Sequence, residues 1–151
     1  MKGKIIVIEG TDGSGKATQA NLLCEFLKSK GENCILQSFP NYDSPSSGPV
    51  KMYLSGELSE NANEVSAYQS SVLFAVDRLC TMQKLKIHLD EGGIVVMDRY
   101  VQSNMTHQAG KIQDGKERDK FLDWLSDFEF GLLDLPKPDF VMFLDVPVEV
   151  S

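Results

Sequence analysis

Basic residues are scarce in this sequence. Its 151 residues include 15 lysines and arginines against 22 aspartates and glutamates, for a formal net charge of -7. A protein that binds nucleic acid over its surface needs a basic face to replace the counterions of the phosphates. The charge balance therefore excludes a general nucleic-acid binder, and any site for an anion must be a local one.

Metal-binding side chains and long apolar runs are also few. The three cysteines, Cys24, Cys34 and Cys80, and the two histidines, His88 and His107, lack the spacing of a metal cluster. We expect the cysteines to be reduced and to pack as small apolar groups. The sequence shows neither a signal peptide nor an apolar run long enough to cross a membrane. We therefore expect a cytoplasmic protein without membrane contact.

Short apolar runs alternate with helical patterns along the chain. With 42% hydrophobic and 25% charged residues, the 151 residues suffice for one domain with a core. Such runs are typical of parallel strands buried on both faces, so the alternation predicts a doubly wound α/β fold. Strands are predicted at Ile5–Ile8, Cys34–Gln37, Ile94–Met97 and Val141–Leu144, helices at Gln19–Lys30, Val50–Leu54, Val65–Leu89 and Glu117–Phe130, and a turn-rich loop at Asn41–Pro49.

The most specific pattern follows the first predicted strand. Gly10 is followed by four residues and then by Gly15 and Lys16. At this spacing successive backbone N–H groups surround a polyphosphate while the lysine contacts its outer oxygens. The helix predicted next would direct its positive N-terminal end at the anion. The alternative is an ordinary tight turn formed by Gly10, Gly13 and Gly15, with a solvated lysine. The glycine offsets favour the first interpretation, in which Gly10–Thr18 form a nucleotide phosphate loop.

One position departs from this pattern. Ala17 stands where a Ser or Thr hydroxyl is expected to bind Mg²⁺, and Thr18 comes one residue late. Magnesium would then be held by the phosphates of the nucleotide, by water and by a carboxylate from another segment. The local pattern predicts either this arrangement or weak metal binding.

Asp98 and Arg99 follow the third predicted strand. Ligands of open parallel sheets bind beyond the C-terminal ends of the strands, where a carboxylate can orient Mg²⁺ or its waters. Asp98 is therefore a candidate for the metal role that Ala17 lacks. Arg99 carries a planar guanidinium suited to a phosphate. The alternative is an Asp98–Arg99 pair that only ends the strand in solvent.

Two side chains of the long predicted helix are also candidates. Val72, Val76 and Leu79 form an aliphatic stripe, whereas Phe74 and Arg78 lie together on roughly the opposite side. An aromatic ring beside a guanidinium on a face away from the core predicts a base-stacking surface next to a phosphate clamp. A helix packed on both sides, with Phe74 buried and Arg78 paired to an acid, is equally compatible with the periodicity.

A second apolar stripe follows near the end of the chain. Phe121, Trp124, Leu125 and Phe128 recur at helical spacing. Such a stripe can serve a dimer interface, although it more often belongs to the core.

Taken together, the sequence resembles the thymidylate kinases. The resemblance covers essentially every residue, and its blocks fall in the order and at the spacings of that family. The blocks are Glu9–Gln19, Phe39–Tyr42, Leu73–Arg78, Asp98–Asn104, Leu135–Asp139 and Phe143–Val150.

The resemblance implies a P-loop NTPase-type three-layer fold, with helices flanking a parallel central sheet. It implies one nucleotide kinase domain over residues 1–151, with the C-terminal part missing before the lid and the last strand of the family. The implied activity is transfer of the γ-phosphoryl group of ATP to dTMP, giving dTDP and ADP in dTTP synthesis, with Mg²⁺ as cofactor. A homodimer is also implied.

For ATP, the resemblance assigns the phosphates to Lys16 and the backbone of Gly13–Thr18. The implied ATP-binding set is Gly10, Thr11, Asp12, Gly13, Ser14, Gly15, Lys16, Ala17 and Thr18.

For catalysis and the metal, the resemblance implies four side chains. Asp98 would hold magnesium-bound water. Asp12 would meet the sugar hydroxyl of the acceptor or its phosphate network, and Arg99 would bind the acceptor phosphate. Lys16, Asp98, Arg99 and Asp12 would thus form the catalytic set.

For dTMP, the resemblance implies that Phe74 stacks on thymine while Arg78 and Asn104 contact the base edge. Tyr42 would join Arg99 at the phosphate. Phe39 would wall the nucleoside, and His107 stands where family members often carry an aromatic that crowds a ribose 2′-hydroxyl. Another nucleoside monophosphate or deoxynucleoside kinase, or a truncated domain that binds nucleotide without activity, are the alternatives.

Overall fold

The structure, a computed structural model, describes residues 2–147 and 149, with the side chain of residue 62 left out. The chain forms two compact units. Unit 1 comprises Met1–Phe39, Lys84–Tyr100 and Lys137–Ser151, and unit 2 comprises Pro40–Gln83 and Val101–Pro136. The organisation of residues 1–151 as one domain stays a prediction.

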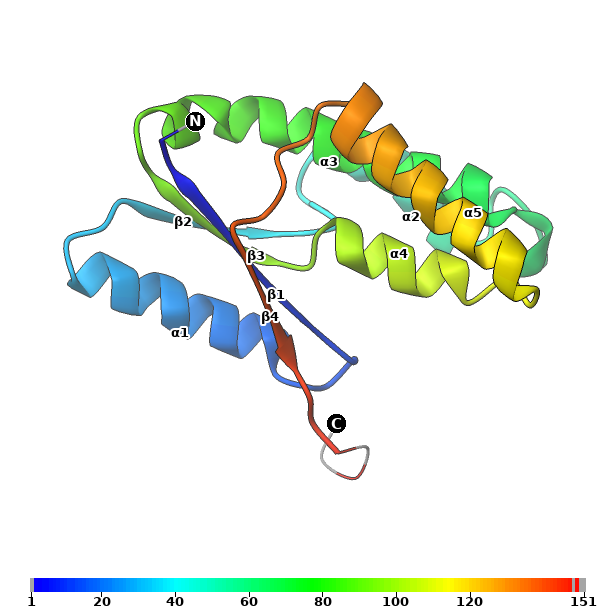
Figure 1. Cartoon of the computed structure of the whole chain (residues 1–151), viewed down its shortest axis with the longest axis horizontal. Helices are drawn as coiled ribbons and strands as arrows, with labels where there is room; N and C mark the ends of the chain where they lie inside the picture. Colours follow the sequence, from blue (N-terminus) through cyan, green and yellow to red (C-terminus); the bar gives the residue numbers. More distant parts are fainter. Residues whose placement is uncertain (1, 148, 150–151) are drawn as a thin grey trace. The chain divides into compact units, whose positions relative to one another are not determined.

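Unit 1 is built on a parallel sheet with strand order β2-β3-β1-β4 (Figure 1). The four strands lie where the apolar runs predicted them, extended by one or two residues at some ends. Their bounds are Lys4–Gly10 for β1, Cys34–Ser38 for β2, Ile94–Asp98 for β3 and Phe140–Leu144 for β4. The predicted α/β fold with a parallel sheet is thus confirmed.

The two inner strands form the core of unit 1. Side chains of β1 and β3 such as Ile5, Val7, Val95 and Val96 are fully buried, as expected for parallel strands covered on both faces. Helix α1, Lys16–Ser29, packs one face through Ala20 and Cys24 against Ile8, Cys34 and Val96 (Figure 1). It starts at Lys16 rather than at the predicted Gln19, because Gly15 takes a left-handed conformation and turns the chain directly into the helix.

Unit 2 is helical. The residues Asp127–Leu132 continue α5 as a π-helical segment, so the single helix predicted over Glu117–Phe130 is divided in two. A helix that the sequence analysis did not predict, α4, occupies Val101–Ala109. The helices are α2 at Gly48–Leu54, α3 at Ala67–Asp90, whose first part lies in this unit, α4, and α5 at Gly115–Ser126, with short 3-10 turns at Pro45–Ser47 and Ala62–Glu64.

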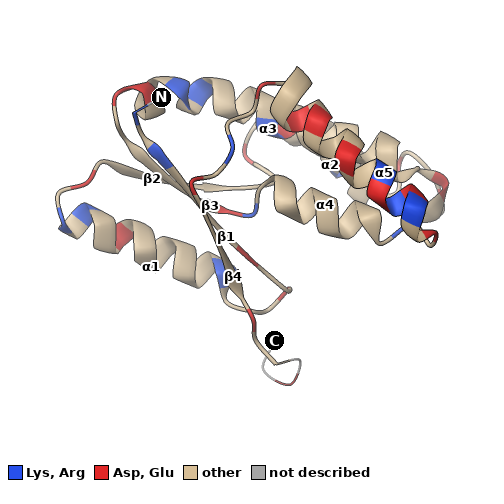
Figure 2. Ribbon diagram, viewed as in Figure 1, with Lys and Arg blue, Asp and Glu red and all other residues tan. Residues whose placement is uncertain are grey.

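The apolar stripe on α5 belongs to the core of unit 2. Phe121 and Leu125 are fully buried and cluster with Ala67 and Ala109. Trp124 stacks on the ring of Phe128, with centroids 5.1 Å apart. The core interpretation of this stripe is confirmed, and Phe121 and Leu125 are not available to a partner chain. Figure 2 shows both acidic and basic residues along α5.

The faces of α3 differ from the sequence prediction. Val72 and Val76 are 36% and 37% exposed, whereas Arg78 is only 3% exposed. The interpretation that placed Arg78 on a face away from the core is therefore wrong, and the competing interpretation, a helix packed on both sides, is right about the burial of Arg78. Predictions from periodicity assume that apolar side chains form the buried face of a helix. In α3 the buried Arg78 side chain belongs to a polar network instead.

The cysteines only partly follow expectation. Cys24 and Cys34 are buried side by side, with their sulfur atoms 2.9 Å apart, whereas Cys80 is exposed on α3. The expected packing of all three as apolar groups is wrong for Cys80. Burial raises the pKa of the Cys34 thiol to about 12. None of the helices in the described part of the chain has the length and apolar character that crossing a membrane requires.

Asp139, just before β4, joins the edge strand to β1. Its carboxylate accepts a hydrogen bond from the backbone N–H of Ile5 at 2.8 Å, and its own N–H donates to the carbonyl of Ile5 at 2.9 Å. Because Ile5 is fully buried, loss of the carboxylate would leave the Ile5 amide without this acceptor.

We predict that Asp139→Ala lowers the free energy of unfolding by about 1–3 kcal/mol, measured by urea titration. Asp139→Asn retains an oxygen acceptor and should lose about 1 kcal/mol or less. Lys4→Met is the control, because the Lys4 ammonium forms only a 3.6 Å ion pair with Asp139 at an exposed position. Equal losses in Asp139→Ala and Lys4→Met would contradict the role of the hydrogen bond.

Candidate active site

The loop between β1 and α1 has the geometry of an anion cradle. Gly15, the residue that caps α1, has φ 91° and ψ 18°. This left-handed conformation is readily adopted by glycine and rarely by other residues. A Cβ atom on Gly10 would lie 2.7 Å from Oγ of Ser14 and 3.1 Å from the carbonyl oxygen of Leu144. The loop is therefore drawn tightly against β4, and its backbone N–H groups lead into the N-terminus of a 14-residue helix.

Gly13 lies in a turn at the exposed tip of this loop. The turn is closed by a hydrogen bond from the N–H of Ser14 to the carbonyl of Thr11 at 3.1 Å, and Gly13 has φ 77°. The alternative interpretation of the sequence, a tight turn at the glycines, is thus right about the turn at Gly13. It is wrong about the lysine, because Lys16 is buried. The predicted contact of Gly13 with ATP phosphates stays a prediction.

The side chain of Lys16 lies within this loop. It is only 7% exposed, and Nζ donates to the carbonyl of Thr11 at 2.8 Å. Nζ is also 3.9 Å from the carboxylate of Asp12, which is 86% exposed. The ammonium is thus held over the loop backbone, where a bound polyphosphate would accept its hydrogen bonds in place of Thr11.

Arg99 stands at the end of β3 in a constrained conformation. Its φ is 70°, which is uncommon for a residue other than glycine. The backbone is held on both sides, because the N–H of Arg99 donates to Ile8 at 3.2 Å and that of Tyr100 donates to the Glu9 carboxylate at 3.1 Å. This turn carries the guanidinium to an ion pair with Asp12. Arg99 is thus paired with the phosphate loop rather than with its neighbour Asp98.

Asp98 has a buried carboxylate oxygen. Its Oδ1 has no hydrogen-bond partner in the described part of the chain. Burial raises the pKa of Asp98, and the positive charges of Lys16 and Arg99 oppose that rise. An orphaned carboxylate oxygen at the end of β3 suits a metal-bound water. The described residues contain no group of three His, Cys, Asp or Glu side chains able to hold a metal ion by themselves.

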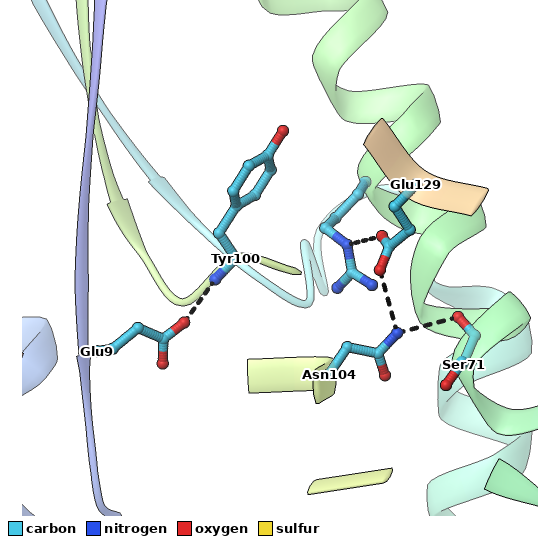
Figure 3. A network of polar contacts seen from close by, with 6 residues as sticks. Glu9, Ser71, Tyr100, Asn104 and Glu129 are labelled. Atoms are coloured by element: carbon cyan, nitrogen blue, oxygen red, sulfur yellow. Dashed lines mark hydrogen bonds and ion pairs between the residues drawn. The ribbon is translucent and has the colours of Figure 1, made fainter. Parts of the chain in front are cut away.

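Unit 2 contains a buried polar network around Glu129 (Figure 3). Arg78 on α3 donates from Nε to Oε1 of Glu129 at 2.6 Å, and both side chains are almost fully buried. Asn104 on α4 donates from Nδ2 to Oε2 of Glu129 at 3.4 Å and to the backbone carbonyl of Ser71 at 3.2 Å. Arg78 is thus paired to an acid, as the second interpretation of α3 predicted. The sequence analysis did not identify Glu129.

Three polar atoms in this network have no partner among the described residues. They are Nη2 of Arg78, Oδ1 of Asn104 and Oγ of Ser71, and all three are buried. Buried polar groups are normally hydrogen-bonded, and exceptions in a native fold call for an explanation. A bound polar ligand that accepts from Arg78 and donates to Asn104 would satisfy two of them.

The other predicted site residues are more scattered. In unit 1, Phe39 is buried against the ring of Tyr100, with centroids 5.8 Å apart. In unit 2, Phe74 meets the ring of Tyr53 edge-on at 6.1 Å. Tyr42 is half exposed, and His107 is exposed on α4.

A loop in unit 2 is anchored to α3 through Asp77. The carboxylate of Asp77 accepts from the backbone N–H of Asn41 at 2.7 Å and from the hydroxyl of Ser46 at 2.6 Å. Lys51 donates to the carbonyl of Tyr42 at 2.6 Å. The loop that carries Tyr42 is therefore fixed at three points, although its tip is exposed.

Comparison with known proteins finds similarity to thymidylate kinases. The family model for thymidylate kinase matches residues 8–151. The chain is 34% identical to the probable thymidylate kinase of Pyrococcus horikoshii, over 100% of this chain and 69% of that protein. It is 35% identical to the thymidylate kinase of Plasmodium falciparum, over 97% of this chain and 63% of that protein. The chain belongs to the thymidylate kinase family.

A solved structure agrees with the sequence comparison. The structure of thymidylate kinase from Candida albicans matches with a TM-score of 0.75 and 29% identity, over 98% of this chain and 65% of that one. The P-loop NTPase-type fold inferred from the sequence blocks is thereby confirmed. The chain spans about two thirds of the length of these thymidylate kinases.

The close approach at Gly10 generates a prediction for the phosphate loop. Gly10→Ala would force the added methyl group against Ser14 and the Leu144 backbone, so we expect a loss of about 1–3 kcal/mol in unfolding free energy and weaker ATP binding by calorimetry. Gly115→Ala is the matched control, because nothing lies within 4 Å of a Cβ at that position. ATP binding that is equal in the two variants would show that the loop tolerates the methyl group.

Proposed function

We propose that this chain carries the dTMP kinase activity of the thymidylate kinase family. The reaction transfers the γ-phosphoryl group of ATP to dTMP, giving dTDP and ADP, and serves dTTP synthesis. The observation that carries the thymine assignment is the unit 2 network, in which Arg78 offers one buried donor and Asn104 one buried acceptor. The 4-oxo and N3–H groups of thymine require that pair.

Unit 1 supplies the ATP half of this proposal. The backbone N–H groups of Gly10–Thr18, with Gly13 at the tip of the loop, would hold the phosphates at the start of α1. Lys16 would exchange its bond to Thr11 for a phosphate oxygen. Arg99 would bind the phosphate of dTMP, with Asp12 beside it contacting the sugar hydroxyl or the phosphate network.

Unit 2 supplies most of the acceptor contacts. Phe74 would stack on thymine while Arg78 and Asn104 contact its edge. Tyr42, on the loop anchored by Asp77, would join the phosphate contacts. Two further residues complete the proposed dTMP set, Phe39 as a wall of the nucleoside and His107 near the 2′ position of the sugar.

The chemistry proposed needs no catalytic base. The acceptor is a phosphate oxygen that is already ionised at neutral pH, so catalysis consists of aligning two polyanions and neutralising charge on the transferred group. Lys16 and Arg99 are suited to that task, since both lie near the phosphate loop and one of them is almost fully buried.

Magnesium fits the residues of unit 1 in one respect. The orphaned Oδ1 of Asp98 can accept a hydrogen bond from a metal-bound water, whereas Ala17 offers no ligand atom. When bound, the ion neutralises charge on the β- and γ-phosphates. We assign Asp98 to its water shell and the remaining ligand positions to the nucleotide and solvent.

The relatives of this chain are named thymidylate kinases. The alternatives, another nucleoside monophosphate or deoxynucleoside kinase and an inactive nucleotide-binding domain, are therefore not favoured. A cytoplasmic location and a homodimer complete the proposal, and the exposed valines Val72 and Val76 are available to such a contact.

The role of the cationic groups can be tested by turnover of ATP-Mg and dTMP. Lys16→Ala and Arg99→Ala should each lower kcat/KM by about a hundredfold or more, because each removes charge stabilisation from the transferred group. Lys28→Ala, on an exposed turn of α1, should leave turnover unchanged. Undiminished turnover in either site variant would refute its assignment, whereas dTMP binding without any turnover in the unsubstituted chain would favour the inactive domain.

Ala17→Ser tests the departure in the phosphate loop. If the missing hydroxyl limits metal affinity, this variant should lower the magnesium concentration needed for half-maximal rate, by about threefold to tenfold. Asn21→Ser is the control, because Asn21 is exposed on α1 and lies outside the phosphate loop. An unchanged magnesium requirement would mean that phosphates, water and Asp98 suffice.

A further inference from the structure

Glu129 lies outside the sequence blocks that carry the family resemblance, yet its carboxylate contacts two of the predicted site residues. It is fully buried in the π-helical segment Asp127–Leu132, and its two carboxylate oxygens contact different side chains. Oε1 accepts from Nε of Arg78 at 2.6 Å and Oε2 accepts from Nδ2 of Asn104 at 3.4 Å. One carboxylate thus holds both residues proposed to contact the base (Figure 3).

The contacts of Asn104 decide which way its amide faces. Its Nδ2 group lies against a carboxylate oxygen of Glu129 and the backbone carbonyl of Ser71, and neither of these can donate a hydrogen bond. The reversed amide would place Oδ1 against two acceptors and leave both unsatisfied. Oδ1 is therefore the atom left without a protein partner among the described residues, as an acceptor.

Arg78 is fixed in a similar way. Glu129 engages Nε, and Nη2 is buried without a partner in the described part of the chain. Arg78 and Asn104 therefore present one donor and one acceptor, while the third orphaned atom, Oγ of Ser71, can act as either. Thymine and uracil match this set through O4, which accepts, and N3–H, which donates. Cytosine presents an amino group and an unprotonated N3, so it would oppose a donor to a donor and an acceptor to an acceptor.

We propose that Glu129 is a positioning residue for base selection, which orients the Asn104 amide and the Arg78 guanidinium so that the pocket accepts 4-oxo pyrimidines and rejects 4-amino pyrimidines. The inference rests on the proposed function, since it assumes that these two side chains contact the base. A buried carboxylate is stable only while it is paired and hydrogen-bonded, and Glu129 meets both conditions.

Glu129→Gln is the decisive variant. Its oxygen would remain with Arg78, the stronger donor, so its NH₂ group would face Nδ2 of Asn104. Two NH₂ groups cannot hydrogen-bond to one another, and the Asn104 amide would turn to present a donor to the base. The ratio of dCMP to dTMP dissociation constants, measured by competition calorimetry, should then fall by about tenfold or more, the equivalent of one hydrogen bond.

A purely structural role for Glu129 would weaken dTMP and dCMP binding by the same factor and leave their ratio unchanged. That result would overturn the inference. Asp127→Asn is the matched control, because this neighbouring acid is exposed and its variant should retain both the affinity and the ratio. A thermal melt of each variant shows that the compared chains are folded.

A second variant keeps the test decisive if Glu129→Gln does not melt cooperatively. Glu129→Asp retains the charge that pairs with Arg78 but draws the carboxylate away from Asn104, whose contact is already the longer one at 3.4 Å. The ratio should then fall by about threefold or more, and an unchanged ratio overturns the inference. If the unsubstituted chain itself binds dTMP no better than dCMP, the thymine-specific function fails.

Discussion

Parallel pairing of β1 with β3 is the constraint on which the phosphate half of the site depends. The register pairs Ile8 with Asp98. The glycine loop that follows β1 and Arg99, which follows β3, therefore begin at the same edge of the sheet. Fully buried side chains on both strands make a shift in this register costly, because a one-residue slip would reverse every side chain. The ion pair between Arg99 and Asp12 follows from this pairing.

The parts of the molecule that could be predicted from sequence are those in which local chemistry decides. Close approach at Gly10 and a left-handed backbone at Gly13 and Gly15 require glycine, and such requirements are visible as glycines at fixed offsets. The inner strands β1 and β3 were predicted because burial on both faces leaves uninterrupted apolar runs. The apolar run of β4 predicted the strand correctly, but the expected burial is wrong there, because its side chains are mostly exposed. The same reasoning placed Asp98 and Arg99 at a strand end, where the structure has them.

The parts that could not be predicted are those in which polar groups occupy buried positions. Helix α4 buries Asn104 and Gln108, so it lacks the apolar stripe that marks a helix. Arg78 is buried while two valines of the same helix are exposed, which inverts the pattern. Glu129 completes that network from 51 residues away, and neither spacing nor local pattern in one sequence reveals such a partner.

The cations of unit 1 show why the phosphate half can be assembled before its ligands arrive. Lys16 and Arg99 both approach the carboxylate of Asp12, whose negative charge offsets the repulsion between them. Since Asp12 is 86% exposed, its ion pairs are weakened by solvent and contribute little to folding. In the proposed function, phosphate oxygens would therefore replace it at small cost. An exposed acid in this position would then hold the two cations together without binding them too firmly for release to the substrates.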